Sequence, residues 1–201
     1  MKKYEIKSIK KLICLFERIP TIGKKSAENI VYSILNMDTS NINEFISILN
    51  DFKKIYHCST CGLYIENNYC HFCNDKERDK STIMVITYPK NAYIFEENNI
   101  YNGMYHVLNG TINISNDISN LYINSLIKRI NNENIKEVII ATDHTLDGET
   151  TAQYILKKIE KNVKKKIKIT RIACGIPIGG CIDYTDSSTI LKSLNGRIKI
   201  N

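Results

Sequence analysis

The sequence predicts an α/β protein in which a helical N-terminal region and a small cysteine-rich knuckle precede a parallel sheet. Short apolar runs alternate with helical stripes between about residues 80 and 172, a pattern typical of a parallel sheet covered by helices. Four closely spaced cysteines come just before that stretch. We therefore expect four regions, at residues 1–56, 57–76, 77–172 and 173–201, the last a loop rich in glycine and proline followed by a terminal helix.

The composition is that of an ordinary globular protein. The chain has 201 residues, of which 43% are hydrophobic and 24% are charged. No run of about twenty apolar residues occurs, so we expect no membrane span, and the charged N-terminus lacks the apolar core of a signal peptide. Outside the four clustered cysteines, Cys14, Cys174 and Cys181 are scattered and expected to be reduced, which fits a reducing cytosol.

The net charge of +7 is concentrated in two basic clusters. The first lies near the N-terminus and consists of Lys2, Lys3, Lys7, Lys10, Lys11, Arg18, Lys24 and Lys25. The second consists of Lys157, Lys158, Lys161, Lys164, Lys165, Lys166 and Lys168 and ends at Arg171. Clusters of this kind favour a polyanionic partner. For the second cluster, a solvated helix face explains the pattern equally well.

The N-terminal region is predicted to contain three helices. Apolar residues recur at helical spacing in residues 9–16, 27–35 and 45–52, and a proline and a glycine in residues 18–24 separate the first helix from the second. Such a turn directs the N-terminus of the second helix outward. Its free backbone N–H groups and the positive end of its dipole can then bind a phosphate.

Lysines surround this turn. Lys24 and Lys25 directly follow Gly23, while Lys10 and Lys11 lie in the first helix. We expect Gly23 and these four lysines to contact DNA phosphates. This mode of binding carries little sequence information. An ordinary hairpin inside a helical bundle explains the same pattern equally well.

The knuckle contains two Cys-x2-Cys pairs, Cys58 with Cys61 and Cys70 with Cys73. Four thiolates at this spacing can surround one tetrahedral Zn²⁺ ion. Gly62 can adopt the positive φ that a tight turn after the first pair often needs. The segment is too short to bury a core, so the metal would supply the folding energy. The alternatives are disulfides or plain buried cysteines.

The third region is predicted to hold the parallel sheet. Strands are expected at residues 83–86, 138–141 and 167–172 and helices at residues 123–130 and 152–159, whereas residues 101–114 are expected to be rich in loop. Ligands of such sheets bind at the carboxyl ends of the strands.

An acidic loop follows the strand at residues 138–141. Its Asp143, Asp147 and Glu149 could converge on a hard cation such as Mg²⁺. Capping of the next helix by Asp147 and Glu149 explains the same residues equally well. We expect His144 to be a loop residue rather than a metal ligand, because a hard cation prefers oxygen.

In this order, these motifs resemble those of the RecR family of bacterial recombination mediators along essentially the whole chain. Besides the four cysteines, the matching segments are residues 19–27, 103–110, 137–142, 147–154, 170–180, 183–186 and 196–197. The resemblance implies a helix-hairpin-helix DNA-binding domain at residues 1–56, a four-cysteine zinc finger at 57–76 and a Toprim domain at 77–172.

The resemblance also implies a function without catalysis. Proteins of this family form ring-shaped clamps, often dimers that pair into tetramers. With RecO and RecF they help to load RecA onto single-stranded gaps coated with single-strand-binding protein. The implied partners are therefore DNA, RecO- and RecF-type proteins and further copies of the chain, in the bacterial cytoplasm near the nucleoid. The acidic residues of the Toprim domain are implicated in contacts with a metal or a partner protein.

The chain departs from the family pattern at several positions. Thr21 replaces the first glycine of the hairpin, Asn29 stands where arginine is usual, and Asp147 replaces a more usual glutamate. The main alternative function is a Mg²⁺-dependent Toprim enzyme acting on DNA, such as a nuclease, primase or topoisomerase. Catalytic sites of that kind need a glutamate after the first strand, where Thr87 stands here, and a second aspartate two residues after Asp143, where Thr145 stands. The catalytic set is therefore incomplete.

A third alternative is an adaptor that uses its zinc knuckle to bind proteins alone. The two basic clusters count against it.

Overall fold

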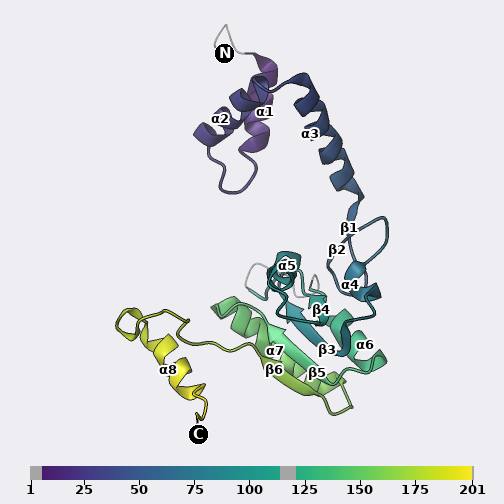
Figure 1. The fold of residues 1–201 in the computed structure, drawn as a ribbon, viewed down its shortest axis with the longest axis vertical. Helices are drawn as coiled ribbons and strands as arrows, with labels where there is room; N and C mark the ends of the chain where they lie inside the picture. The colour runs from purple at the N-terminus through teal and green to yellow at the C-terminus, as the bar shows by residue number, and fades with distance from the viewer. Residues whose placement is uncertain (1–5, 114–120, 201) are drawn as a thin grey trace. The chain divides into compact units, whose positions relative to one another are not determined.

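The structure is a computed structural model that describes residues 6–113 and 121–200 (Figure 1). It consists of two compact units, Met1–Lys54 and Ile55–Asn201. Lys2 and Lys3 of the first basic cluster lie outside the described residues. Among the described helices, none combines the length and the apolar character that crossing a bilayer requires.

The N-terminal unit contains α1 (Lys7–Phe16), α2 (Lys24–Leu35), α3 (Thr39–Asp51) and a short 3-10 turn at Phe52–Lys54. These are the three helices that the apolar periodicity predicts. In the described part of this unit only Ala27 and Val31, both on α2, are buried. Helix α3 and the first residue of the 3-10 turn expose large apolar side chains to about half of their full extent: Phe45, Ile46, Ile48, Leu49 and Phe52.

The knuckle opens the second unit. Its strands β1 (Ile55–His57) and β2 (Tyr64–Glu66) pair antiparallel, and the short helix α4 (His71–Asn74) follows. Leu63 between the strands is fully buried. Ile65 of β2 and Phe72 of α4 are partly buried against the same apolar cluster.

The sheet consists of β3 (Asp79–Ile86), β4 (Gly103–Val107), β5 (Glu137–Ala141) and β6 (Lys168–Arg171) in the order β4-β3-β5-β6. All three pairings are parallel, which confirms the predicted α/β class. Both faces of the central strands are covered, so these strands are apolar along their whole buried length.

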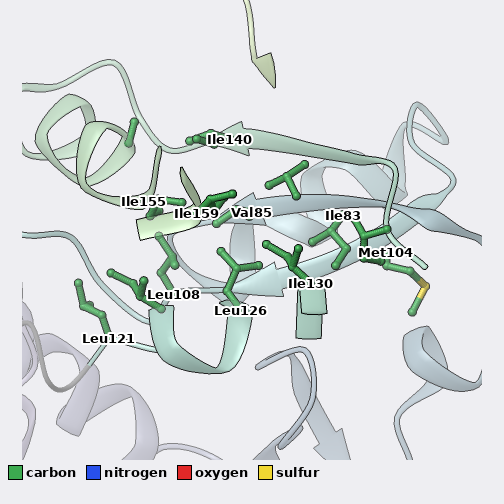
Figure 2. Packing of buried hydrophobic residues seen from close by; sticks show 14 residues of the cluster. Ile83, Val85, Met104, Leu108, Leu121, Leu126, Ile130, Ile140, Ile155 and Ile159 are labelled. Atoms are coloured by element: carbon green, nitrogen blue, oxygen red, sulfur yellow. The ribbon is translucent and has the colours of Figure 1, made fainter. Parts of the chain in front are cut away.

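Successive residues of the strands enter two separate apolar clusters. Ile83 and Val85 pack with α6 (Ile123–Asn132) and α7 (Leu146–Asn162) on one face. Figure 2 shows this cluster, in which Leu126, Ile130, Ile155 and Ile159 of the helices meet the strands. Met84 and Ile86 point to the other face, where α5 (Pro89–Glu97) and the knuckle cover them.

Two features of this unit differ from the sequence-based expectation. The segment 101–114 is rich in loop as expected, but it also contains the strand β4 at Gly103–Val107, and all five residues of that strand are buried. Its mixed residues show neither alternation nor an aliphatic run, so periodicity misses it. Helix α5 was not expected either, since its polar residues dilute the apolar stripe. Ile114, at the end of the expected loop, lies outside the described residues.

The C-terminal segment contains a 3-10 turn at Ile182–Tyr184 and α8 (Ser187–Asn195). The carboxylate of Asp186 caps α8 by accepting hydrogen bonds from the backbone N–H groups of Ser188 and Thr189, each at 3.0 Å. The Ser193 hydroxyl on α8 accepts a hydrogen bond of 2.9 Å from the backbone N–H of Ile176. This contact ties α8 to the loop that follows β6.

Candidate metal centre, hairpin and acidic loop

The four cysteines of the knuckle converge on one point. Their Sγ atoms all lie within 4.8 Å of one another. The Sγ atoms of Cys61 and Cys70 are 3.6 Å apart and those of Cys58 and Cys73 are 3.9 Å apart. A regular tetrahedron with Zn–S bonds of about 2.3 Å has an S···S edge of about 3.8 Å. The donor set therefore fits one tetrahedral divalent metal ion.

The backbone around the first cysteine pair holds this geometry. Gly62 has a φ of 77°, and a Cβ atom at this position would lie 2.9 Å from the Cβ of Val107. The N–H of Val107 donates a 2.8 Å hydrogen bond to the carbonyl oxygen of Cys61. The turn therefore needs glycine for two reasons. One is the positive φ, which the sequence predicted, and the other is the close approach to β4. The four-cysteine cluster is thus built directly onto the edge strand of the sheet.

The thiols of this cluster cannot all ionise without a cation. Hydrogen bonds with Cys70 and Cys73, together with burial, raise the pKa of the Cys61 thiol. The hydrogen bond with Cys61 is the main cause that lowers the pKa of Cys70 to about 2. One thiolate is therefore stabilised by its protonated neighbours, whereas a bound divalent cation would deprotonate all four.

The hairpin between α1 and α2 contains a strained residue. Thr21 has a φ of 73°, in the left-handed region that β-branched residues rarely adopt. The N–H of Ile22 donates a 3.1 Å hydrogen bond to the carbonyl oxygen of Ile19 and closes the turn. Gly23 is the N-cap of α2 with a φ of −81°, and a Cβ atom there would meet nothing within 4 Å. The fold of this unit therefore does not itself require glycine at position 23.

The structure groups some of the predicted hairpin lysines and separates others. Lys10 and Lys24 line one groove of about 520 Å³ between α1 and α2. Lys10 also lines a second hollow of about 470 Å³ along α1, together with Lys11. Lys25 is exposed at the start of α2 and borders neither hollow. The first turn of α2 has no acidic residue, so no carboxylate of that turn offsets the positive end of the helix dipole.

The acidic loop follows β5 and leads into α7. The hydroxyl of Thr145 caps α7 by accepting a 3.2 Å hydrogen bond from the N–H of Gly148. A Cβ atom at Gly148 would lie 2.0 Å from the carbonyl oxygen of Asp143, so the loop folds this tightly only with glycine there. Asp147 and Glu149 lie in the first turn of α7, where negative charge is favourable.

Glu149 forms the centre of an ion-pair cluster. Its Oε1 lies 3.0 Å from Nδ1 of His144, 3.1 Å from Nη2 of Arg171 and 3.6 Å from Nζ of Lys192. The hydrogen bonds from His144 and Arg171 lower the pKa of this carboxyl. The cluster joins the start of α7, the end of β6 and α8.

The three acidic residues do not gather around one point in this conformation. Across residues 6–113 and 121–200, the four cysteines are the one set of three or more His, Cys, Asp or Glu side chains close enough to share a metal ion. The side chains of Asp143 and Asp147 form no hydrogen bond or ion pair with the described residues, whereas Glu149 is held by its cationic partners. The Mg²⁺ site therefore remains a prediction.

Two polar residues near these sites are buried, and their burial was not predicted from the sequence. Thr87, directly after β3, is 1% exposed, and its Oγ1 has no hydrogen-bond partner among the described residues. His106 on β4 donates from Nε2 to the carbonyl oxygen of Tyr122 at 2.9 Å, and its Nδ1 is buried without a partner in the same part of the chain. Burial lowers the pKa of His106 to about 4, so this ring is neutral at neutral pH.

Comparison with known proteins agrees with this architecture. The Toprim domain family matches residues 81–173, and the family described as RecR, C-terminal matches residues 175–198. The chain is 41% identical over 198 residues to "Recombination protein RecR" of Phytoplasma mali (strain AT), with 94% of each chain covered. It is 40% identical over 197 residues to the protein of the same name from Treponema denticola, with 96% of this chain and 98% of the relative covered.

These similarities confirm the resemblance drawn from the ordered motifs. They extend over nearly the full length of both chains, so they include the hairpin and the knuckle as well as the sheet. The chain belongs to the RecR family of recombination proteins.

Proposed function

We propose that this chain is a DNA-binding scaffold that mediates recombinational DNA repair. The observation that carries the proposal is the similarity, over at least 94% of each chain, to two proteins named for recombination. The basic hairpin and the four-cysteine centre supply a physical basis, because one offers cations to phosphates and the other offers a rigid metal-held module.

The hairpin is the proposed site of contact with DNA phosphates. Gly23 has no steric reason within the unit to be glycine, which fits a position where another backbone approaches closely. Lys24 and Lys25 stand at the open N-terminus of α2, and Lys10 shares a groove with Lys24. Lys11 extends the positive surface along α1. These contacts would bind gapped, single-stranded or double-stranded DNA without reading its sequence.

The metal in the knuckle is proposed to be a single structural Zn²⁺ held by Cys58, Cys61, Cys70 and Cys73. Four thiolates in a closed tetrahedral set leave no open position for a substrate, which is typical of structural zinc. The ion would fix the knuckle against β4 through the Cys61–Val107 hydrogen bond. Its chemistry there is ligation, and no reaction step depends on it.

An enzymatic role is the second candidate and is less well supported. Thr87 stands at the buried position where a catalytic Toprim site would need a carboxylate, and Glu149 is paired with Arg171 and Lys192. A Mg²⁺ ion at Asp143 and Asp147 would have to draw Glu149 away from these cations or do without it. We propose instead that the start of α7, with Asp143, Asp147 and Glu149, contacts a protein partner.

The proposed assembly follows the family. Copies of the chain would form a dimer or a tetrameric ring, for which the exposed apolar face of α3 offers a surface to bury. RecO- and RecF-type proteins would join this ring and promote the loading of RecA onto single-stranded gaps coated with single-strand-binding protein. The proposed place of action is the bacterial cytoplasm, at the nucleoid.

One incubation separates the two candidate functions. The purified protein is mixed with labelled gapped DNA and Mg²⁺ across a series of salt concentrations, and binding and strand integrity are measured together. The scaffold predicts binding that weakens steeply with salt while the DNA stays intact. Nicked, relaxed or extended DNA would support the enzyme, provided that an Asp143→Asn variant loses the activity. Absence of both binding and chemistry would contradict the proposed DNA contact.

A further inference from the structure

The second basic cluster has no part in the function proposed so far. Between Gln153 and Lys168 the chain carries seven lysines against one acidic residue, Glu160. The sequence alone leaves two explanations for this excess, a solvated helix face and a surface for a polyanion. The structure allows the two to be distinguished residue by residue.

Helix α7 places its lysines away from the sheet. Thr151, Ala152, Ile155 and Ile159 are the buried residues of its middle and C-terminal turns. Lys157 and Lys161 are exposed on the same helix, and Lys164 and Lys166 are exposed in the turn that leads to β6. Because α7 covers the face of the sheet opposite the knuckle, this basic surface is also distinct from the metal centre.

Three of the seven lysines have local partners. Lys165 donates a hydrogen bond to the carbonyl oxygen of Glu133, Lys168 pairs with the Glu137 carboxylate at 3.2 Å, and Nζ of Lys158 lies 5.4 Å from the centre of the Tyr154 ring. Contacts within the fold of the unit therefore account for Lys158, Lys165 and Lys168.

The other four lysines are not explained in this way. In the part of the chain that the structure describes, no carboxylate lies within 4.0 Å of the Nζ atoms of Lys157, Lys161, Lys164 and Lys166. Glu160 is their one acidic neighbour in sequence, and it forms no ion pair with them. The negative end of the helix dipole favours Lys161 in the last turn, but this effect falls off within one turn and does not reach Lys166.

We propose that Lys157, Lys161, Lys164 and Lys166 form a second phosphate-binding surface for DNA, on the α/β unit and separate from the hairpin. Four cations without a carboxylate partner in a short segment repel one another, and a strand of phosphates relieves this repulsion and releases its own counterions. The identification of the polyanion as DNA rests on the proposed function, whereas the positive surface itself does not.

The test compares two triple variants of the full-length protein. Lys157→Gln, Lys161→Gln and Lys164→Gln together remove the proposed contacts. Lys76→Gln, Lys80→Gln and Lys128→Gln together remove the same charge from exposed lysines elsewhere in the unit. Binding to a labelled gapped DNA is measured across a salt series, and a thermal unfolding curve for each variant verifies that the fold is retained. A Lys24→Ala, Lys25→Ala variant is measured in parallel.

The proposal predicts that the first triple variant flattens the slope of log Kobs against log salt by about two to three units, the value for three lost phosphate contacts. The control triple should leave the slope unchanged. Equal effects of the two triples would show that net charge alone matters and would overturn the proposal. An unchanged slope for the first triple with a flattened slope for the hairpin variant would also overturn it, while leaving the proposed function intact. Wild-type protein that binds anionic vesicles but not DNA would contradict both.

Discussion

In the described part of the N-terminal unit only Ala27 and Val31 are buried, whereas both faces of the sheet in the second unit carry a buried apolar cluster. The two units therefore derive their structure from different sources. The sheet unit has a core and a four-cysteine cluster that could hold a metal ion. The N-terminal unit relies on helix propensity, one tight turn and a small helix–helix contact.

The same contrast is visible in the glycines. Gly148 and Gly62 are required by the fold, because a side chain at either position would collide with backbone or side-chain atoms. Gly23 stands in open space. Gly62 and Gly148 thus serve internal packing, whereas the open space at Gly23 is what the proposed contact with DNA would use.

The largest expected effect comes from breaking the metal centre. Cys61→Ser removes one of four ligands from a site that is buried against β4, so we expect loss of the metal and unfolding of the knuckle. The sheet unit should then lose several kcal/mol of stability, because Leu63 and the second apolar cluster lose their cover. The measurements are zinc content and the midpoint of thermal unfolding.

The matched control is Cys181→Ser, since Cys181 is exposed and far from the centre in sequence. It should retain one metal ion per chain and the wild-type midpoint. A Cys61→Ser protein with full metal content and an unchanged midpoint would rule out the structural role of the site.

The second prediction compares Gly148, which the fold requires, with Gly23, which it does not. Gly148→Ala should cost about 3 kcal/mol, because its Cβ would lie 2.0 Å from the carbonyl oxygen of Asp143 and the loop must open. Gly23→Ala should leave stability nearly unchanged and weaken binding to gapped DNA. Urea unfolding and a binding titration distinguish the two outcomes, and a Gly23→Ala variant that binds like wild type would remove the hairpin from the DNA site.

The third prediction concerns the strain at Thr21. Thr21→Gly relieves a left-handed conformation that costs a β-branched residue about 1–2 kcal/mol, but it also gives the unfolded chain more freedom. We expect a net gain of about 1 kcal/mol, confined to the N-terminal unit. Hydrogen exchange of the α1 and α2 amides should slow, while that of β3 and β5 stays the same. Faster exchange in α1 and α2 would show that the turn does not hold Thr21 in this conformation.

How far the sequence predicts the structure depends on how local the determining contacts are. The helices of residues 9–16 and 123–130 and the cysteine centre were predictable, because periodicity and spacing lie within one short window. Strand β4 was not, since its burial comes from neighbours on both sides of the sheet. The Glu149 cluster was not either, because Arg171 lies 22 residues away and Lys192 further still. No pattern within a short window of sequence indicates a pairing between residues so far apart.

The smallest effect should come from that cluster, which ties α7, β6 and α8 together. The pKa of Glu149 is lowered by the hydrogen bonds from His144 and Arg171, so its carboxylate stabilises the folded state at pH values above the ordinary value of 4.5. This stabilisation is lost as the pH falls through the lowered pKa of the folded protein. Glu149→Gln should therefore have a slightly lower unfolding midpoint than wild type at pH 7, and the two midpoints should converge towards pH 3.

A difference between the midpoints that stays constant from pH 7 to pH 3 would mean that the carboxylate charge does not stabilise this junction. Lys192→Gln provides the matched variant on α8, because it removes one of the three partners and leaves Glu149 and Arg171 in contact. Its midpoint should lie between those of wild type and Glu149→Gln at pH 7. Such an order would show that α8 is attached to the sheet unit through this carboxylate.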